Sequence, residues 1–166
     1  MGSPPAANIF TNRGLQAKLL LAALAGPCVW GILYWVFDQP LASRLHEARV
    51  WGLTDTAFLH ALLFAVLIYP LLEEIVFRGA LQGFLIERLS GKRLPNWLGG
   101  LSLANLITSV VFAAMHLFNQ SPLWAALIFF PSLVFGWARE ATGGLMAPVL
   151  LHMFYNAGFY FLFVQV

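Results

Sequence analysis

Long runs of apolar residues dominate this sequence and restrict the folds open to it. Hydrophobic residues fill 60% of its 166 positions and charged residues 10%, and the mean hydropathy is +0.79. A helix needs about 20 mainly apolar residues to cross a bilayer core. Because the runs are continuous and do not alternate with polar residues, they favour helices over barrel strands. The sequence therefore predicts an all-α fold, a polytopic transmembrane bundle. The runs cover residues 15–37, 55–89, 98–118, 123–138 and 145–164.

The number of membrane segments depends on how the chain continues through Pro70. As one helix, residues 55–89 would be roughly 50 Å long, which exceeds a single crossing of ~30 Å. They form either one long kinked helix or two segments that meet near Pro70, which gives five or six membrane segments. Residues 38–54 space their apolar side chains as a short interfacial helix does. We expect residues 1–14 to be disordered or interfacial, and 15–166 to form one integral membrane domain.

Charge and cysteine content exclude several classes of function. The net charge is only +2, and basic residues in connecting segments indicate membrane topology rather than nucleic-acid binding. The single cysteine, Cys28, cannot form an intramolecular disulfide or a Cys-cluster metal site, and we expect it to be buried. Orientation stays open, because a break at Pro70 would place most basic residues opposite the N-terminus. With one long helix, six basic residues lie on the same side of the membrane as the N-terminus: Arg13, Lys18, Arg88, Lys92, Arg93 and Arg139.

Two adjacent glutamates and an arginine interrupt the second apolar run. Each charge at membrane depth costs roughly 2.5–3.5 kcal/mol on insertion scales, so each requires a partner or a function. On a helix, Glu74, Arg78 and Gln82 share one face, and Glu74 can form an ion pair with Arg78. Glu73 points about 100° away and has no partner within its own helix. It must be protonated or find a partner on another helix.

Polar side chains also share a face in the third and last runs. Steps of three and four residues place them on one side of a helix that ends near His116, and such stripes face the bundle interior. The stripe consists of Ser102, Asn105, Ser109, Phe112 and His116. In the last run, His152 and Asn156 lie one turn apart and can point at the same place. Taken singly, each of these groups could be a hydrogen bond between helices.

Together these groups are sufficient for hydrolysis of a peptide bond without a serine or cysteine nucleophile. A carboxylate can accept a proton from water, and a nearby histidine can orient or share that proton. Histidine and asparagine donors can stabilise the oxyanion of the tetrahedral intermediate.

Three motifs in this order resemble the signature of the CAAX protease and bacteriocin-processing (CPBP, or Abi) family, which are glutamic-type intramembrane endopeptidases. The resemblance covers residues 69–166, the motif-bearing core. The motifs are Glu73-Glu74-x-x-x-Arg78, Phe112-x-x-x-His116 and His152-x-x-x-Asn156.

The resemblance implies a role for each motif residue. Glu73 would be the base that activates water together with His116, while His152 and Asn156 would form the oxyanion hole. Glu74 would share in the site or support it. The further supporting residues would be Arg78 and Phe112.

The resemblance also implies a location and a class of substrate. The chain would be a multi-pass protein of a bacterial or archaeal cell membrane, would need no cofactor or metal, and would bind no nucleic acid. Its partners would be the bilayer and a membrane-anchored protein or peptide, trimmed near the membrane or at a C-terminal sorting tail. A prenylated CaaX protein is the alternative substrate, although family members with that substrate carry additional helices.

Other readings of the same residues lead to different functions. Glu73, His116 and His152 could bind zinc with an open fourth position, although the HExxH spacing is absent. The polar core could instead bind a peptide without cleaving it, as in an immunity protein. A serine protease is disfavoured because Ser132 is not in a Gly-x-Ser-x-Gly elbow. An aspartyl protease is disfavoured because Asp38 and Asp55 lie at membrane boundaries.

The depth of the two histidines is a test of a shared site. His116 lies near the end of its run and His152 nearer the start of its own. Unless those helices tilt or shift, the two side chains lie at different depths. A separation above about 12 Å would contradict a shared site, since hydrogen bonds reach ~3 Å or one water further.

Overall fold

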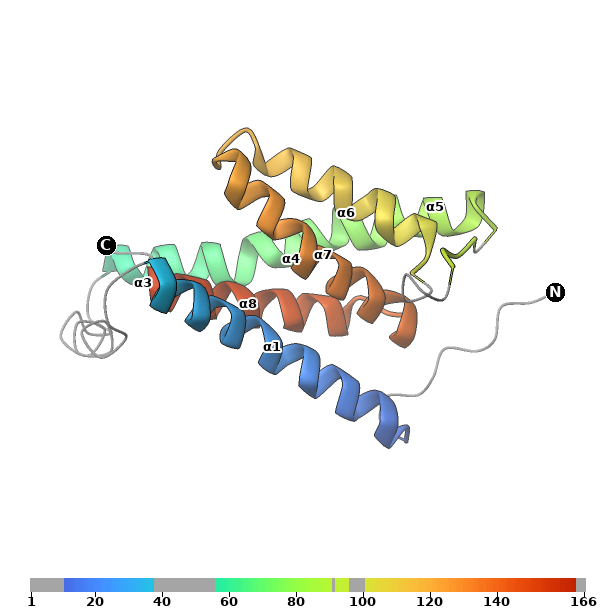
Figure 1. Ribbon diagram of the computed structural model, residues 1–166, viewed down its shortest axis with the longest axis horizontal. Coiled ribbons are helices and arrows are strands. Elements are labelled where there is room, and N and C mark those ends of the chain that lie inside the picture. Colours follow the sequence, from blue (N-terminus) through green and yellow to red (C-terminus); the bar gives the residue numbers. More distant parts are fainter. Residues whose placement is uncertain (1–10, 38–55, 91, 96–100, 164–166) are drawn as a thin grey trace.

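The computed structural model describes residues 11–37, 56–90, 92–95 and 101–163 (Figure 1). The interfacial helix expected over 38–54 and most of the N-terminal segment expected over 1–14 lie outside these residues. Among the described residues every regular element is a helix, apart from an isolated antiparallel bridge between Arg93 and Ser102. The prediction of an all-α fold is confirmed.

The first helix, α1, spans Arg13–Phe37 and begins two residues before the expected start at Leu15. Asn12 explains this start, because its Oδ1 accepts a hydrogen bond of 3.0 Å from the backbone N–H of Leu15. Asparagine is among the preferred residues for capping a helix N-terminus in this way.

One continuous helix runs from Thr56 to Arg88, in alternating α and π segments. The residues flanking η1, α4 and η2 have right-handed helical dihedral angles, from Leu62 to Gln82. Pro70 lies in the first turn of α4 and does not divide the helix. The structure therefore has the single long helix, the first of the two expected arrangements. The segments are α3 (Thr56–Leu62), η1 (Leu63–Ile68), α4 (Tyr69–Glu74), η2 (Ile75–Leu81) and α5 (Gln82–Arg88).

Three further helices complete the bundle: α6 (Leu103–His116), α7 (Pro122–Thr142) and α8 (Met146–Phe163). Helix α6 begins later than the expected Leu98, because the Ser102 side chain caps it by accepting a hydrogen bond of 2.9 Å from the N–H of Asn105. Helix α7 continues to Thr142, four residues beyond the end of the apolar run expected over 123–138. Gly143 ends that helix in the left-handed conformation that glycine adopts most easily, with φ of 69°.

Helix α6 packs antiparallel along α7, whereas α1 packs parallel along α8 (Figure 1). The ends of α5 and α7 lie at the same end of the bundle as the starts of α1, α6 and α8. The main hydrophobic core fills the space between α7 and α8, and α1 covers it through Leu19, Ala22 and Ala23. Its buried members are Phe135, Ala138, Ala147, Leu151 and Tyr155.

Large apolar side chains cover much of the outer surface, as expected of a membrane protein. Among the described residues, two stretches are long and apolar enough to cross a membrane, Arg13–Ile32 and Pro122–Thr142. The expected total of five or six membrane segments stays a prediction. Cys28 was expected to be buried and is exposed. It lies two residues from Gly26, on the side of α1 that faces away from α8, and in a membrane an apolar side chain can remain there.

Gly136 in α7 lets α6 approach closely. A Cβ at this position would lie 2.5 Å from Cγ of Asn105. That side chain cannot easily move, because its Nδ2 donates to the Leu133 carbonyl at 3.0 Å and its Oδ1 accepts from Ser109 at 3.1 Å.

We therefore expect Gly136→Ala to destabilise the protein by about 1–3 kcal/mol through overpacking. Thermal unfolding in detergent measures the change. Gly83→Ala is the matched control, because a Cβ there meets nothing within 4 Å and alanine favours the helix. Equal stability of the two variants would show that α6 and α7 do not pack as described.

Candidate active site

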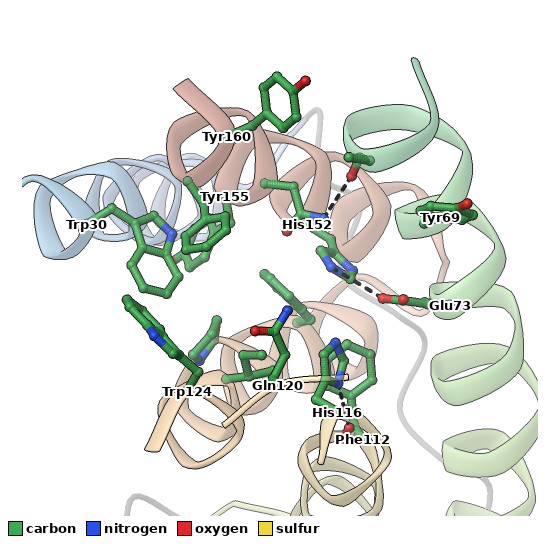
Figure 2. A pocket seen from close by; sticks show the side chains of 16 residues that line it. Trp30, Tyr69, Glu73, Phe112, His116, Gln120, Trp124, His152, Tyr155 and Tyr160 are labelled. Atoms are coloured by element: carbon green, nitrogen blue, oxygen red, sulfur yellow. Dashed lines mark hydrogen bonds and ion pairs between the residues drawn. The ribbon is translucent and has the colours of Figure 1, made fainter. Parts of the chain in front are cut away.

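One cavity of about 290 Å³ is lined by the four polar residues expected to act on a substrate, Glu73, His116, His152 and Asn156 (Figure 2). They come from α4, the end of α6, and α8. Glu73 and the histidines lie toward one side of the cavity, and the indoles of Trp30 and Trp124 lie on the opposite side. The rest of the wall is mainly aromatic and includes Tyr69, Phe112, Phe135, Tyr155, Phe159 and Tyr160.

The structure separates the two adjacent carboxylates. Glu73 lines the cavity, and its side chain is 33% exposed. Glu74 is fully buried outside the cavity, and its Oε2 lies 3.3 Å from Nε of Arg78. The expected ion pair within the helix is therefore confirmed. Of the two, only Glu73 is placed to reach a molecule in the cavity.

Arg78 is fully buried and joins the long helix to α7. Its Nη2 donates to the Ser132 carbonyl at 2.9 Å and to the Ser132 hydroxyl at 2.7 Å. Its guanidinium carbon lies 4.9 Å from the ring centre of Phe112 and 5.8 Å from that of Phe135. The buried hydroxyl of Ser132 accepts from the arginine and does not line the cavity, so it is not placed as a nucleophile.

His152 lies between the two glutamates. Its Nδ1 is 2.9 Å from Oε1 of Glu74, and its Nε2 is 3.6 Å from Oε2 of Glu73. The imidazole stacks on the ring of Phe135, with centroids 4.7 Å apart. Of the two alternatives that the sequence left open for Glu73, the structure has a partner on another helix, His152.

His116 is held by its own helix. Its Nδ1 lies 2.9 Å from the Phe112 carbonyl. A carbonyl can only accept, so Nδ1 carries the proton, and Nε2 of the neutral ring is left as an acceptor. The rings of His116 and His152 both contact the Phe112 ring, with centroids 4.8 and 5.8 Å away. The two imidazoles are no further apart than the sum of these distances, which lies below the limit of about 12 Å for a shared site.

Asn156 makes a contact that sequence reasoning missed. Its Nδ2 donates to the Ala65 carbonyl at 2.9 Å, and both residues line the cavity. A backbone acceptor leaves no trace in side-chain spacing, so the spacing of polar residues did not indicate it.

Helix α1 supplies one wall of the cavity through Trp30, which sequence reasoning also missed. The Tyr155 hydroxyl donates to the Ala22 carbonyl at 2.6 Å, and a Cβ at Gly26 would lie 2.5 Å from Cδ1 of Tyr155. The Trp30 ring then packs on Trp124 and Phe159, with centroids 6.0 and 5.2 Å away. Nothing in the sequence indicates which helix approaches the motif residues from this side.

These features define a helical membrane protein with a carboxylate, two imidazoles and an amide in one cavity, groups that can bind and activate water beside a peptide bond. Residues 55–158 match the family described as type II CAAX prenyl endopeptidase Rce1-like. The chain belongs to this Rce1-like family, which confirms the expected CPBP resemblance. The match begins earlier than the expected Tyr69 and leaves α1 outside it.

Two relatives are similar over part of the chain. An uncharacterized 24.3 kDa protein of Escherichia coli is 39% identical over 92 residues, which is 55% of this chain and 39% of that protein. The membrane-embedded CAAX protease MroQ of Staphylococcus aureus (strain USA300) is 32% identical over 101 residues, 60% of this chain and 37% of that protein. The matches thus span less than two-fifths of either relative. No solved structure matches the chain.

The close approach at Gly26 makes the position of α1 testable. We expect Gly26→Leu to push α1 away from α8 and lower stability by ~1–3 kcal/mol, measured as a lower midpoint of thermal unfolding in detergent. Gly31→Leu is the matched control, since a Cβ at that glycine of the same helix meets nothing within 4 Å. If both variants unfold at the same temperature, α1 does not dock on Tyr155.

Proposed function

We propose that the chain is a glutamic-type intramembrane endopeptidase in which Glu73 activates water together with His116. The observation that carries this proposal is the division between the glutamates, because Glu74 is neutralised by Arg78 and Glu73 faces the cavity. The acceptor nitrogen of His116 can bind the same water and share its proton.

In this mechanism the water oxygen attacks the carbonyl carbon of the substrate while its proton passes to Glu73. The peptide oxygen becomes an oxyanion, and the intermediate collapses when the C–N bond breaks. As this bond breaks, the proton on Glu73 passes to the leaving nitrogen, which returns the carboxylate to its starting form.

His152 is suited to stabilise the oxyanion. His152 lines the cavity, and its Nε2 lies 3.6 Å from Oε2 of Glu73. Glu74 holds the other nitrogen of the ring and so sets its orientation. Asn156, the second expected donor, also lines the cavity, but its Nδ2 already donates to the Ala65 carbonyl. A donor to the oxyanion is worth about 2.7–4 kcal/mol in other hydrolases.

The cavity supports a membrane-anchored protein or peptide as the substrate. Its volume of about 290 Å³ lies at the lower end for ligand pockets, ~300–1,000 Å³. It has room for the residues flanking one bond, and its aromatic wall favours an apolar side chain there. We propose processing of a membrane peptide or a C-terminal tail in a bacterial or archaeal cell membrane, with residues 15–166 as one multi-pass domain. A prenylated CaaX protein is the second candidate, which the family description favours.

Substitution of the water-activating pair tests the mechanism. We expect Glu73→Gln and His116→Ala to lower cleavage at least ~100-fold, the scale of general acid–base catalysis. Glu74→Gln should retain measurable cleavage, because Glu74 does not face the cavity. The assay follows cleavage of a library of membrane-anchored peptides in proteoliposomes by mass spectrometry.

Glu87→Gln is the matched control, since Glu87 lies in the last turn of α5 and does not line the cavity. Cleavage that survives in Glu73→Gln but not in Glu74→Gln would reverse the assignment of the two carboxylates. Peptide binding without cleavage by the wild type would favour the non-catalytic, immunity-type reading.

Removal of metal separates this mechanism from a zinc hydrolase built on Glu73, His116 and His152. Among the residues that the structure describes, no group of three His, Cys, Asp or Glu is arranged to hold a metal ion. Both Nδ1 atoms are already engaged, by the Phe112 carbonyl and by Glu74. We expect a chelator to leave the cleavage rate unchanged and the purified protein to contain less than stoichiometric zinc. Loss of activity with EDTA and its return with zinc would contradict the glutamic mechanism.

A further inference from the structure

Pro70 leaves one backbone carbonyl of the long helix without its normal donor. The N–H of Tyr69 donates to the Phe64 carbonyl, five residues back, as in a π-helix. In that register the next donor, at position 70, would serve the Ala65 carbonyl. Proline has no N–H, so neither Tyr69 nor Pro70 donates to Ala65.

Asn156 supplies the missing donor from α8. Its Nδ2 lies 2.9 Å from the Ala65 oxygen, within hydrogen-bond distance. An unsatisfied backbone group in an apolar bundle costs several kcal/mol, so a fixed donor from a neighbouring helix stabilises the turn before Pro70. The amide of Asn156 therefore stands in for the backbone donor that Pro70 removes.

This bond lies beside the proposed base. Pro70 is fully buried and precedes Glu73 by three residues in α4. One turn before Asn156 on α8, His152 contacts Glu74 at 2.9 Å. Helix α8 thus holds the long helix on both sides of Pro70, and these two contacts determine how Glu73 is presented to the cavity.

We propose that Asn156 is a positioning residue, which acts on turnover by completing the helix at Pro70 and thereby orienting Glu73. The inference rests on the proposed function where it concerns turnover. It differs from an oxyanion donor in one respect: the need for Asn156 depends on the proline. An alanine at position 70 has an N–H, and in either the α or the π register the Ala65 carbonyl then has a backbone donor.

A double-mutant cycle between Pro70→Ala and Asn156→Ala tests this dependence. We expect Asn156→Ala alone to lower kcat by about 100-fold, the loss typical of a catalytic group misplaced by about 1 Å. In the Pro70→Ala background, the loss of kcat caused by Asn156→Ala should be about 10-fold smaller. The loss of thermal stability caused by Asn156→Ala should be smaller in that background as well. KM should change less than kcat in both backgrounds.

Asn105→Ala is the matched control, because it also removes a hydrogen bond from an asparagine to a backbone carbonyl, that of Leu133. Its effect should be the same with or without Pro70→Ala. An equal loss of kcat from Asn156→Ala in both backgrounds would overturn the positioning role and assign Asn156 to the oxyanion. If the effects of Pro70→Ala and Asn156→Ala on the unfolding temperature are additive, Asn156 does not replace the backbone donor that Pro70 lacks. This stability cycle needs no substrate, so it is independent of whether the chain proves to be a peptidase.

Discussion

The ion pair between Glu74 and Arg78 determines how the rest of the site is arranged. Both side chains are fully buried in an apolar bundle, where a lone charge would be prohibitively costly. Pairing within one helical turn neutralises them before any other helix is involved. Glu74 then has one oxygen left for His152, and Glu73 alone carries a carboxylate into the cavity. Adjacent glutamates acquire different surroundings because successive residues of a helix point about 100° apart.

The same helical face attaches the long helix to α7. Arg78 binds Ser132, and one turn later Gln82 donates to the Gly136 carbonyl at 3.1 Å and to Glu140 at 2.8 Å. The Ser102 hydroxyl, which also caps α6, donates to the same carboxylate. Because α6 and α7 are both fixed to this face, the imidazole at the end of α6 is held in place relative to α4. The polar groups outside the cavity therefore set the geometry within it.

Helical periodicity was sufficient to predict contacts within one helix and the faces that turn inward. It predicted the pairing of Glu74 with Arg78 and the buried face that carries Asn105 and Ser109. Helical periodicity could not predict contacts between helices, because the spacing of residues along the chain does not show which helices meet. The placement of His152 between the glutamates and of Trp30 in the cavity wall depends on packing between residues far apart in the chain. The end of α7 was missed because a charged stretch resembles a loop, although Glu140 is bonded to side chains of the long helix and of the residue that caps α6.

Pro70 shows why the break considered for the long helix did not occur. In water, a carbonyl freed by proline can be solvated, and the chain can bend or end there. In an apolar bundle a donor within the protein stabilises the freed carbonyl, and here a neighbouring helix carries that donor at the correct depth. The π segment before Pro70 places the open position at Ala65, beside α8. Asn156, which supplies this donor, is then needed to stabilise the backbone of the long helix, whatever it contributes to substrate binding. Occurrence within a motif therefore does not by itself identify a side chain that touches the reacting atoms.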